Sequence, residues 1–284
     1  MSKTKKEFLQ LELKSYERRL KILDMILCAG GSHIPCALSI IDIITCLYGK
    51  VLNIDARNPK DPRRDKFVLS KGHGVAALYV VLSEMGFFPE SELKRYCSVG
   101  GILGGHPDST KVPGIEASTG SLGHGFSVAV GFALANKIDE IESSVYCLVG
   151  DGECNEGSIW EAAMSAAHYN LDNLTLIIDN NKLQISGFTK DVLDPLSFVE
   201  KFNAFGFNTV EIDGHSFEEI SNAFEKKFDN GKPKAIVANT VKGKGISYME
   251  NERKWHGMFP IKEEAKVAKN DLENKVHQLE GLLK

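Results

Sequence analysis

The sequence predicts an α/β protein with a doubly wound parallel sheet flanked by helices. Four short β-branched runs, at 145–149, 174–178, 209–212 and 235–241, are separated by stretches with helical spacing of apolar residues. Strands that alternate with helices indicate a parallel sheet, because each strand returns to the sheet through a helix packed on its face. Ligands of such sheets bind beyond the carboxyl ends of the strands, so the residues that follow each run are the first candidates for a site.

The composition is that of an ordinary globular protein with a substantial core. Of 284 residues, 43% are apolar and 25% are charged, and we expect one domain over 1–284 with a helical extension from about residue 261. The formal net charge of -4 argues against a nucleic-acid partner, because a surface that follows phosphates needs a positive excess. No apolar run approaches the roughly 20 residues that cross a bilayer, and residues 1–10 lack the apolar stretch of a signal peptide. We therefore expect no membrane association and a cytoplasmic location.

The helices and loops follow from hydrophobic spacing and turn residues. Apolar residues at helical spacing over 8–29, with charges on the opposite side, predict an amphipathic helix. After a glycine-rich turn, the apolar stretch 38–48 suits a more deeply buried helix, and the Pro- and charge-rich segment 58–64 predicts a loop. Two further helices are predicted over 157–169 and 261–284, the second of them charged and amphipathic.

The cysteines show no pairing or metal-binding pattern, because no CxxC pair or metal-ligand spacing is present. Cys36 and Cys154 lie within motifs described below, yet nothing nearby in sequence resembles the arrangement that activates a nucleophilic thiol. We expect reduced, mostly buried thiols without a redox role at Cys28, Cys36, Cys46, Cys97, Cys147 and Cys154.

Oxygen-bearing side chains follow two of the predicted strands. Asp151 lies in Gly150-Asp151-Gly152 after the first run, and Asn181 follows the second; adjacent parallel strands would bring the two turns together. A carboxylate and an amide oxygen suit Mg²⁺, which prefers oxygen ligands completed by phosphate and water. Gly152 lets the backbone approach a phosphate, and the start of helix 157–169 would favour a diphosphate. Gly-Asp-Gly alone is a common turn, but the paired spacing indicates a metal and diphosphate site.

Several motifs resemble those of the transketolase family and occur in the same order. GDGECNEGSIWEA followed by LIIDNNKLQISG is similar to the family's thiamine-diphosphate motif. The other matching stretches are SHI (32–34), VLSKGHG (68–74), GGHP (104–107), STGSLGHG (118–125), VKGKG (241–245) and KWHG (254–257). The resemblance runs from residue 32 to 257 and covers the cofactor domain, the first of three in a full-length chain. It implies a thiamine-diphosphate-binding fold with thiamine diphosphate and Mg²⁺ as cofactors, Ca²⁺ and Mn²⁺ being alternatives to Mg²⁺.

The resemblance implies a metal site with three oxygen ligands, which are Asp151, Asn181 and the backbone carbonyl of Leu183. It places Gly152 against the diphosphate and gives main-chain contacts with the cofactor to two residues, Gly120 and Leu122. The residues that would line the diphosphate and substrate side are Lys71, His73, Lys242 and His256. Two cationic side chains suit phosphate partners, although solvated loop lysines are the alternative.

The catalytic residues implied by the resemblance are four histidines and two glutamates: His33, His73, His106, His256, Glu156 and Glu161. His33 and His106 would contact the sugar and assist proton transfers, and the glutamates would relay protons between the two cofactors of a dimer. Imidazoles exchange protons near neutral pH, which cleavage of a sugar-phosphate C–C bond requires. An ordinary surface or core position is the alternative for each histidine, and it is what we expect of His124, His168, His215 and His277.

The chain departs from the family pattern just after the first histidine. Where relatives commonly carry Gly or a small polar residue, this chain has Ile34-Pro35-Cys36. A serine at this point would donate a hydrogen bond to a substrate phosphate, whereas a cysteine thiol is a weak donor. We therefore expect the substrate preference near His33 to differ.

These features predict the amino-terminal subunit of a split transketolase. The resemblance implies transfer of a two-carbon ketol unit from a ketose phosphate to an aldose phosphate, as in the pentose phosphate pathway. In the family, the carboxylate that acts on the aminopyrimidine of the cofactor comes from the second domain, which lies beyond the matched motifs. We expect a separate carboxyl-terminal subunit that carries the pyrimidine-binding and C-terminal domains, in a heterotetramer.

Three other functions are alternatives. The α subunit of a 2-oxo acid dehydrogenase shares the metal motif and works with a β subunit, but KGHG, GHP and WHG argue against it. Deoxyxylulose-phosphate synthase shares the carbanion chemistry but is normally one chain. A non-catalytic subunit that binds the cofactor only to regulate a partner is disfavoured by the intact metal ligands and the four histidines.

Overall fold

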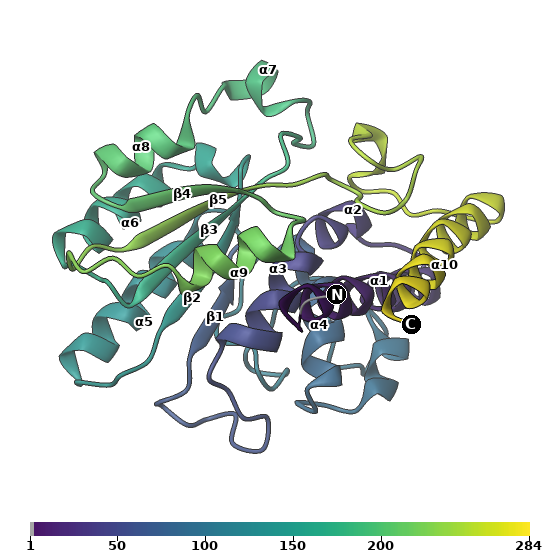
Figure 1. Cartoon of the computed structure of the whole chain (residues 1–284), viewed down its shortest axis with the longest axis horizontal. Coiled ribbons are helices and arrows are strands. Elements are labelled where there is room, and N and C mark those ends of the chain that lie inside the picture. Colours follow the sequence, from purple (N-terminus) through teal and green to yellow (C-terminus); the bar gives the residue numbers. More distant parts are fainter. Residues whose placement is uncertain (1–2) are drawn as a thin grey trace.

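The computed structural model describes residues 3–284 and contains a five-stranded sheet in the order β1-β2-β3-β5-β4 (Figure 1). The strands are β1 (Lys66–Leu69), β2 (Val145–Gly150), β3 (Leu174–Asn180), β4 (Asn208–Asp213) and β5 (Lys234–Asn239). All neighbouring strands are parallel. β2 and β3 are almost wholly buried, because the inner strands of a parallel sheet are covered on both faces. The predicted doubly wound α/β fold is confirmed.

Helices cover both faces of this sheet (Figure 1). One layer contains α1 (Lys3–Ala29), α2 (Ile34–Leu38), α3 (Ile41–Cys46), α4 (Val75–Glu84) and α9 (Phe217–Glu225), with α10 (Glu263–Leu283) packed along α1. The other layer contains α5 (His124–Ile138), α6 (Gly157–His168) and α8 (Phe198–Ala204), and the short α7 (Thr189–Leu193) precedes α8. Leu148 and Ile177 point into the first core, and Val149 and Ile178 into the second, as the alternation of side chains along a strand requires.

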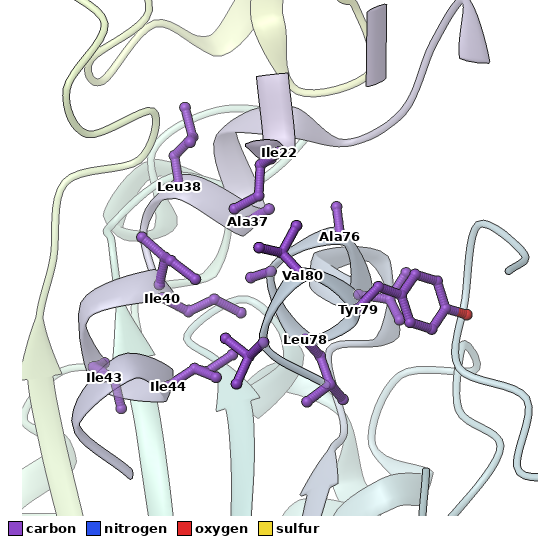
Figure 2. Packing of buried hydrophobic residues seen from close by; sticks show 14 of the residues in the cluster. Ile22, Ala37, Leu38, Ile40, Ile43, Ile44, Ala76, Leu78, Tyr79 and Val80 are labelled. Atoms are coloured by element: carbon purple, nitrogen blue, oxygen red, sulfur yellow. The ribbon is translucent and has the colours of Figure 1, made fainter. Parts of the chain in front are cut away.

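The larger core fixes the position of the segment after α1. Figure 2 shows Ile22, Ala37, Ile40 and Val80 within one cluster, and all four are fully buried or nearly so. Burial of an Ile or Val side chain contributes about 1.5–3 kcal/mol to folding. Since α2 and α4 are held in this way, the residues at their amino-terminal ends have fixed positions at the edge of the sheet.

The buried helix predicted over 38–48 is confirmed from Ile41 to Tyr48, but a turn at residues 39–40 separates it from the preceding helix. α2 ends at Leu38, α3 begins at Ile41, and a helical turn, η1 (Leu47–Val51), follows. Ser39 lies at the break, and its hydroxyl donates to the Asp179 carboxylate at the end of β3 (2.9 Å). Side-chain hydrogen bonds of this kind compete with the regular helix, and this one depends on a residue distant in sequence.

The remaining differences concern the strands. β1 was not predicted, because Lys66–Leu69 is too short to give a clear periodic signal. β5 ends at Asn239, so Thr240 and Val241 belong to the segment that leaves the sheet. The other three strands are confirmed within one or two residues.

The predicted helices over 8–29, 157–169 and 261–284 are present as α1, α6 and α10, and 58–64 forms turns as expected. Within residues 3–284, no helix has the length and apolar character needed to cross a membrane. All six cysteines are unpaired, and four of them are buried.

Candidate functional site

The turns that follow β2 and β3 lie side by side, as the sequence predicted. Gly150 and Asp179 are partners in the register of these strands. The Asp151 carboxylate accepts hydrogen bonds from the Gly152 backbone N–H (2.7 Å) and from that of Lys182 in the second turn. One buried carboxylate therefore joins the two loops.

The three oxygens proposed as metal ligands face the same region. Asn181 Oδ1 accepts from the Leu183 backbone N–H (3.1 Å), and its amide group donates to Asp179 (2.9 Å). The Leu183 carbonyl oxygen accepts from Lys242 Nζ (2.6 Å), so a cation already lies against this oxygen. Carboxylate, amide and carbonyl oxygens are the ligands that Mg²⁺ and Ca²⁺ prefer.

The surroundings of Asp151 fit a bound divalent cation. This side chain is 2% exposed, and burial together with the neighbouring Asp179 charge raises its pKa to about 6. A cation would stabilise the ionised form. Gly152 fits a diphosphate, because a Cβ there would lie 2.8 Å from the Gln184 side chain and would fill the space between them.

One cavity of about 370 Å³ collects most of the predicted site residues. Twelve of them line it: His33, Lys71, His73, His106, Gly120, Leu122, Asp151, Gly152, Asn181, Leu183, Lys242 and His256. They come from segments that span most of the chain. The remaining lining residues, to which the sequence assigned no ligand or catalytic role, are Cys36, Gly150, Glu153, Gln184, Ile185 and Ser186.

Four imidazole rings meet at this cavity. The ring of His33 lies 5.5 Å from that of His73, 5.6 Å from that of His256 and 6.3 Å from that of His106. Burial lowers the pKa of His73 well below its usual value and that of His256 to about 3, and the ammonium groups of Lys71 and Lys242 lower both further. Neutral rings offer one donor and one acceptor each, so they can bind sugar hydroxyls.

Lys71 is a buried residue and not a solvated loop lysine. It is 1% exposed, and its ammonium group donates to the Asp179 carboxylate and to the Cys36 carbonyl (3.3 Å). Burial alone would raise the pKa of Asp179, but the Lys71 charge together with hydrogen bonds from Lys71, Thr240 and Asn181 outweighs it and holds the pKa below its ordinary value. Asp179 was not predicted to have a role, although a charged residue at the end of an apolar strand was a usable signal.

Lys242 is also buried, at 2% exposure, and burial lowers its pKa. Besides the Leu183 carbonyl, its Nζ contacts His256 Nδ1 (2.7 Å). When the ammonium group donates to Nδ1, the neutral His256 ring carries its own proton on Nε2. Nε2 is therefore the atom of this ring that can donate a hydrogen bond to a ligand.

A second buried carboxylate, Glu153, was also missed. It accepts from the backbone N–H groups of Gly123 (2.9 Å) and Gly150 (3.0 Å) and from the Ser70 hydroxyl. These bonds join the STGSLGHG segment to the turn after β2. Glu153 therefore positions the loop that carries Gly120.

Two predicted catalytic residues do not line the cavity. Glu156 precedes α6, Glu161 lies in α6, and both side chains are exposed. The first turn of α6 is outside the cavity too, so its N–H groups do not line the region where we expected them to favour a diphosphate. The cavity is lined instead by Gly152 and Glu153. The interface role of the two glutamates stays a prediction.

The unusual Cys36 reaches the cavity, whereas Ile34 and Pro35 pack inward. Its sulfur and ring nitrogens of His73 and His256 lie within 4.8 Å of one another. The departure from the family pattern therefore changes the chemistry of the cavity wall. As expected of ordinary surface histidines, three others are exposed: His124, His168 and His277.

The sequence is similar to a known protein family and to two named transketolase subunits. A family model described as "Transketolase, thiamine diphosphate binding domain" matches residues 12–278. The chain is 42% identical over 271 residues to one subunit of the apulose-4-phosphate transketolase of Phocaeicola vulgatus, covering 95% of this chain and 96% of that protein. It is 44% identical over 247 residues to 6-deoxy-6-sulfo-D-fructose transketolase subunit SqwG of a Clostridium species, covering 86% and 89%.

Among solved structures, transketolase of Campylobacter jejuni superposes with a TM-score of 0.82 and 29% sequence identity. The match covers 97% of this chain and 48% of that one. The chain thus spans about half the length of that transketolase but nearly the full length of the two subunits named above.

Proposed function

This chain belongs to the transketolase family, and we propose that it is the amino-terminal subunit of a two-chain transketolase that transfers a two-carbon ketol unit from a ketose phosphate to an aldose phosphate. The matched part is the family's thiamine-diphosphate-binding domain. One observation carries the proposal: the three residues proposed as oxygen ligands, two lysines and four histidines line a single cavity at the carboxyl edge of the sheet.

The metal and cofactor roles follow from this chain's own groups. Asp151, Asn181 and the Leu183 carbonyl would hold Mg²⁺, or another oxygen-seeking divalent ion, and Gly152 would admit the diphosphate. Bound thiamine diphosphate supplies the carbon nucleophile that cleaves and re-forms a C–C bond beside a carbonyl group. Lys71 and Lys242 would bind anionic oxygens at the same edge.

The histidines would handle the sugar. The rings of His33, His73 and His256 have lowered pKa values and are neutral near pH 7. Neutral rings can orient hydroxyl groups, because each offers one donor and one acceptor, whereas a ring with a pKa of about 3, such as that of His256, is a weak base and would position the sugar instead of taking its proton. His106 is exposed at the rim of the cavity, where an incoming sugar would meet it first.

A partner subunit would complete the site. Relatives of nearly the same length are named as single subunits of a transketolase. In addition, the side chain of Ile185, which lines the cavity, is 65% exposed, and Leu193 and Leu196 nearby in sequence are 59% and 74% exposed. Apolar exposure beside a cavity favours cover by another chain. We propose that this partner carries the pyrimidine-binding and C-terminal domains, in a heterotetramer.

The proposal is tested with the purified chain, its candidate partner and the two together. We expect ketol transfer only in the mixture with thiamine diphosphate and Mg²⁺, and full activity of this chain alone would overturn the two-chain assignment. Donors should include apulose 4-phosphate and 6-deoxy-6-sulfofructose, since relatives are named for these sugars. Pyruvate oxidation serves as the control for a 2-oxo acid dehydrogenase.

A further inference from the structure

Lys242 lies on the segment that leaves β5, and the backbone of this segment is held on both sides of it. The Val241 backbone N–H donates to His215 Nε2 (2.8 Å), and the Lys244 carbonyl accepts from Arg19 Nε (3.1 Å). Between these points, the Gly243 N–H donates to the Pro35 carbonyl (3.1 Å). The peptide units around Lys242 are thus tied to other elements.

One buried carboxylate joins the two side chains that hold this segment. Asp42 of α3 accepts two bonds from the Arg19 guanidinium (2.8 and 2.7 Å) and one from His215 Nδ1 (2.7 Å). The Arg19 and Asp42 side chains are 0% and 5% exposed, and that of His215 is 13% exposed. Ser15 and the Leu38 carbonyl accept further bonds from Arg19. The network joins α1, α3 and the loop after β4 to the segment of Lys242.

The hydrogen bonds fix the tautomer of His215. Nε2 accepts from a backbone N–H that can only donate, so the proton of the neutral ring is on Nδ1, where Asp42 accepts it. A carboxylate that orients an imidazole in this way is a common device for positioning a ring. His215 was expected at an ordinary surface or core position, and nothing in its immediate sequence shows that its ring binds the segment after β5.

Two short contacts constrain the position of the Lys242 ammonium group. Its Nζ contacts both the Leu183 carbonyl (2.6 Å) and His256 Nδ1 (2.7 Å). Gly243 adopts φ +81°, and a Cβ there would lie 2.5 Å from the Met249 carbonyl oxygen, so the segment cannot slide freely. A shift of the backbone by about 1 Å would break these contacts, since hydrogen bonds weaken steeply outside their normal distances.

We propose that Arg19, Asp42 and His215 form a positioning network that holds Lys242 at the cofactor and substrate cavity, although none of the three lines that cavity. The inference rests on the proposed function for the identity of the ligand. In this proposal Arg19, Asp42 and His215 are positioning residues that act on Lys242 through the backbone of Val241 and Lys244. Loss of His215 therefore acts on ligand binding by way of Lys242.

A double-mutant cycle tests the network in the complex of the chain with its partner, with thiamine diphosphate plus Mg²⁺ as the titrated ligand. We expect His215→Ala to weaken binding by about tenfold or more, as loss of such orienting partners does. His215→Gln should recover most of the affinity, because its amide offers both an N–H donor for Asp42 and a carbonyl acceptor for the Val241 N–H. In a Lys242→Met background, His215→Ala should have no further effect, because coupled residues are not additive.

A purely structural role gives a different result. In that case His215→Ala would weaken binding equally with and without Lys242, and this outcome overturns the proposal. Arg64→Met is the matched control, since it breaks a buried ion pair with Glu116 at residues that do not line the cavity. It should lower the melting temperature and leave ligand affinity unchanged.

Hydrogen exchange separates failure of this inference from failure of the proposed function. The Val241 amide should be protected in the wild-type chain and should exchange faster in His215→Ala, whether or not any ligand binds. Unchanged Val241 protection overturns the network. Absence of thiamine diphosphate binding by the wild-type complex, with the protection difference intact, overturns the proposed function alone.

Discussion

Lys242 Nζ lies 2.7 Å from His256 Nδ1 and 2.6 Å from the Leu183 carbonyl oxygen. One buried ammonium group thus binds a histidine that lines the cavity and an oxygen that we assign to the metal. The two contacts give Lys242 opposite effects on two ligands. It attracts an anion such as diphosphate, and it repels a cation that approaches the Leu183 carbonyl.

Lys242→Met should therefore change the two affinities in opposite directions. Thiamine diphosphate should bind about tenfold or more weakly, the usual cost of losing a charged hydrogen bond. Mg²⁺ or Ca²⁺ alone should bind more tightly, because the competing charge is gone. Isothermal titration with the metal alone and with the cofactor measures both. Lys244→Met is the matched control, and weaker binding of both ligands to Lys242→Met would contradict the assignment.

Asp151→Asn should abolish metal-dependent cofactor binding. The change removes the only charged ligand of the proposed set. It also replaces one of the two carboxylate oxygens by an NH₂ group, so the side chain can no longer accept from both the Gly152 and the Lys182 backbone N–H groups. Loss of one acceptor for a buried donor lowers the free energy of unfolding by about 1–3 kcal/mol. Titration calorimetry and urea unfolding measure the two effects. Asp55→Asn, at an exposed carboxylate, is the control and should change neither quantity. If Asp151→Asn keeps its metal affinity, the metal binds at another site.

His106→Ala distinguishes a catalytic subunit from a regulatory one. We expect kcat of the two-chain complex to fall by about 10²–10⁴, the usual contribution of a positioned acid–base group. Cofactor affinity should change much less than kcat, because His106 is exposed at the rim, and its ring lies beside Gly120, which would bind the cofactor through its main chain. Steady-state kinetics and cofactor titration give the comparison, with His168→Ala as an exposed control. Unchanged turnover would favour the regulatory alternative.

Cys36→Ser tests whether the unusual cysteine sets the substrate preference. Serine is a stronger donor than a thiol, so KM for a phosphorylated sugar should fall by about 3–10-fold with kcat unchanged. A donor sugar without a phosphate in reach of this position should show no change. Cys97→Ser, at an exposed cysteine, is the control. If KM does not respond for any phosphorylated sugar, Cys36 does not face the phosphate.

Asp42 should make the fold sensitive to acid. Burial would raise its pKa, but the Arg19 guanidinium and then His215 outweigh burial and hold the pKa well below its ordinary value. A carboxyl group with a depressed folded pKa stabilises the fold above its unfolded pKa, and this contribution is lost as pH falls below about 4. Urea unfolding between pH 5 and 3 should show a shallower decline for Asp42→Asn than for wild type. Equal slopes would show that Asp42 is not held ionised.

The proximity of Asp151 and Asn181 could be predicted from the local sequence pattern. Each follows a β-branched run, and the geometry of parallel sheets alone brings such strand ends together. The family motifs then named twelve residues that the structure places around one cavity. The break at Ser39 was not predictable in the same way, because it depends on a bond with Asp179.

The sequence by itself determined the fold class, the placement of Asp151 and Asn181 at neighbouring strand ends and the histidine motifs, because these depend on local periodicity and on short motifs. The tertiary structure alone decided that Lys71 is buried against Asp179 and that His215 reaches the segment after β5. Both contacts join residues from separate strands and helices. Such contacts depend on how the layers pack, and no spacing within one segment of the chain specifies them.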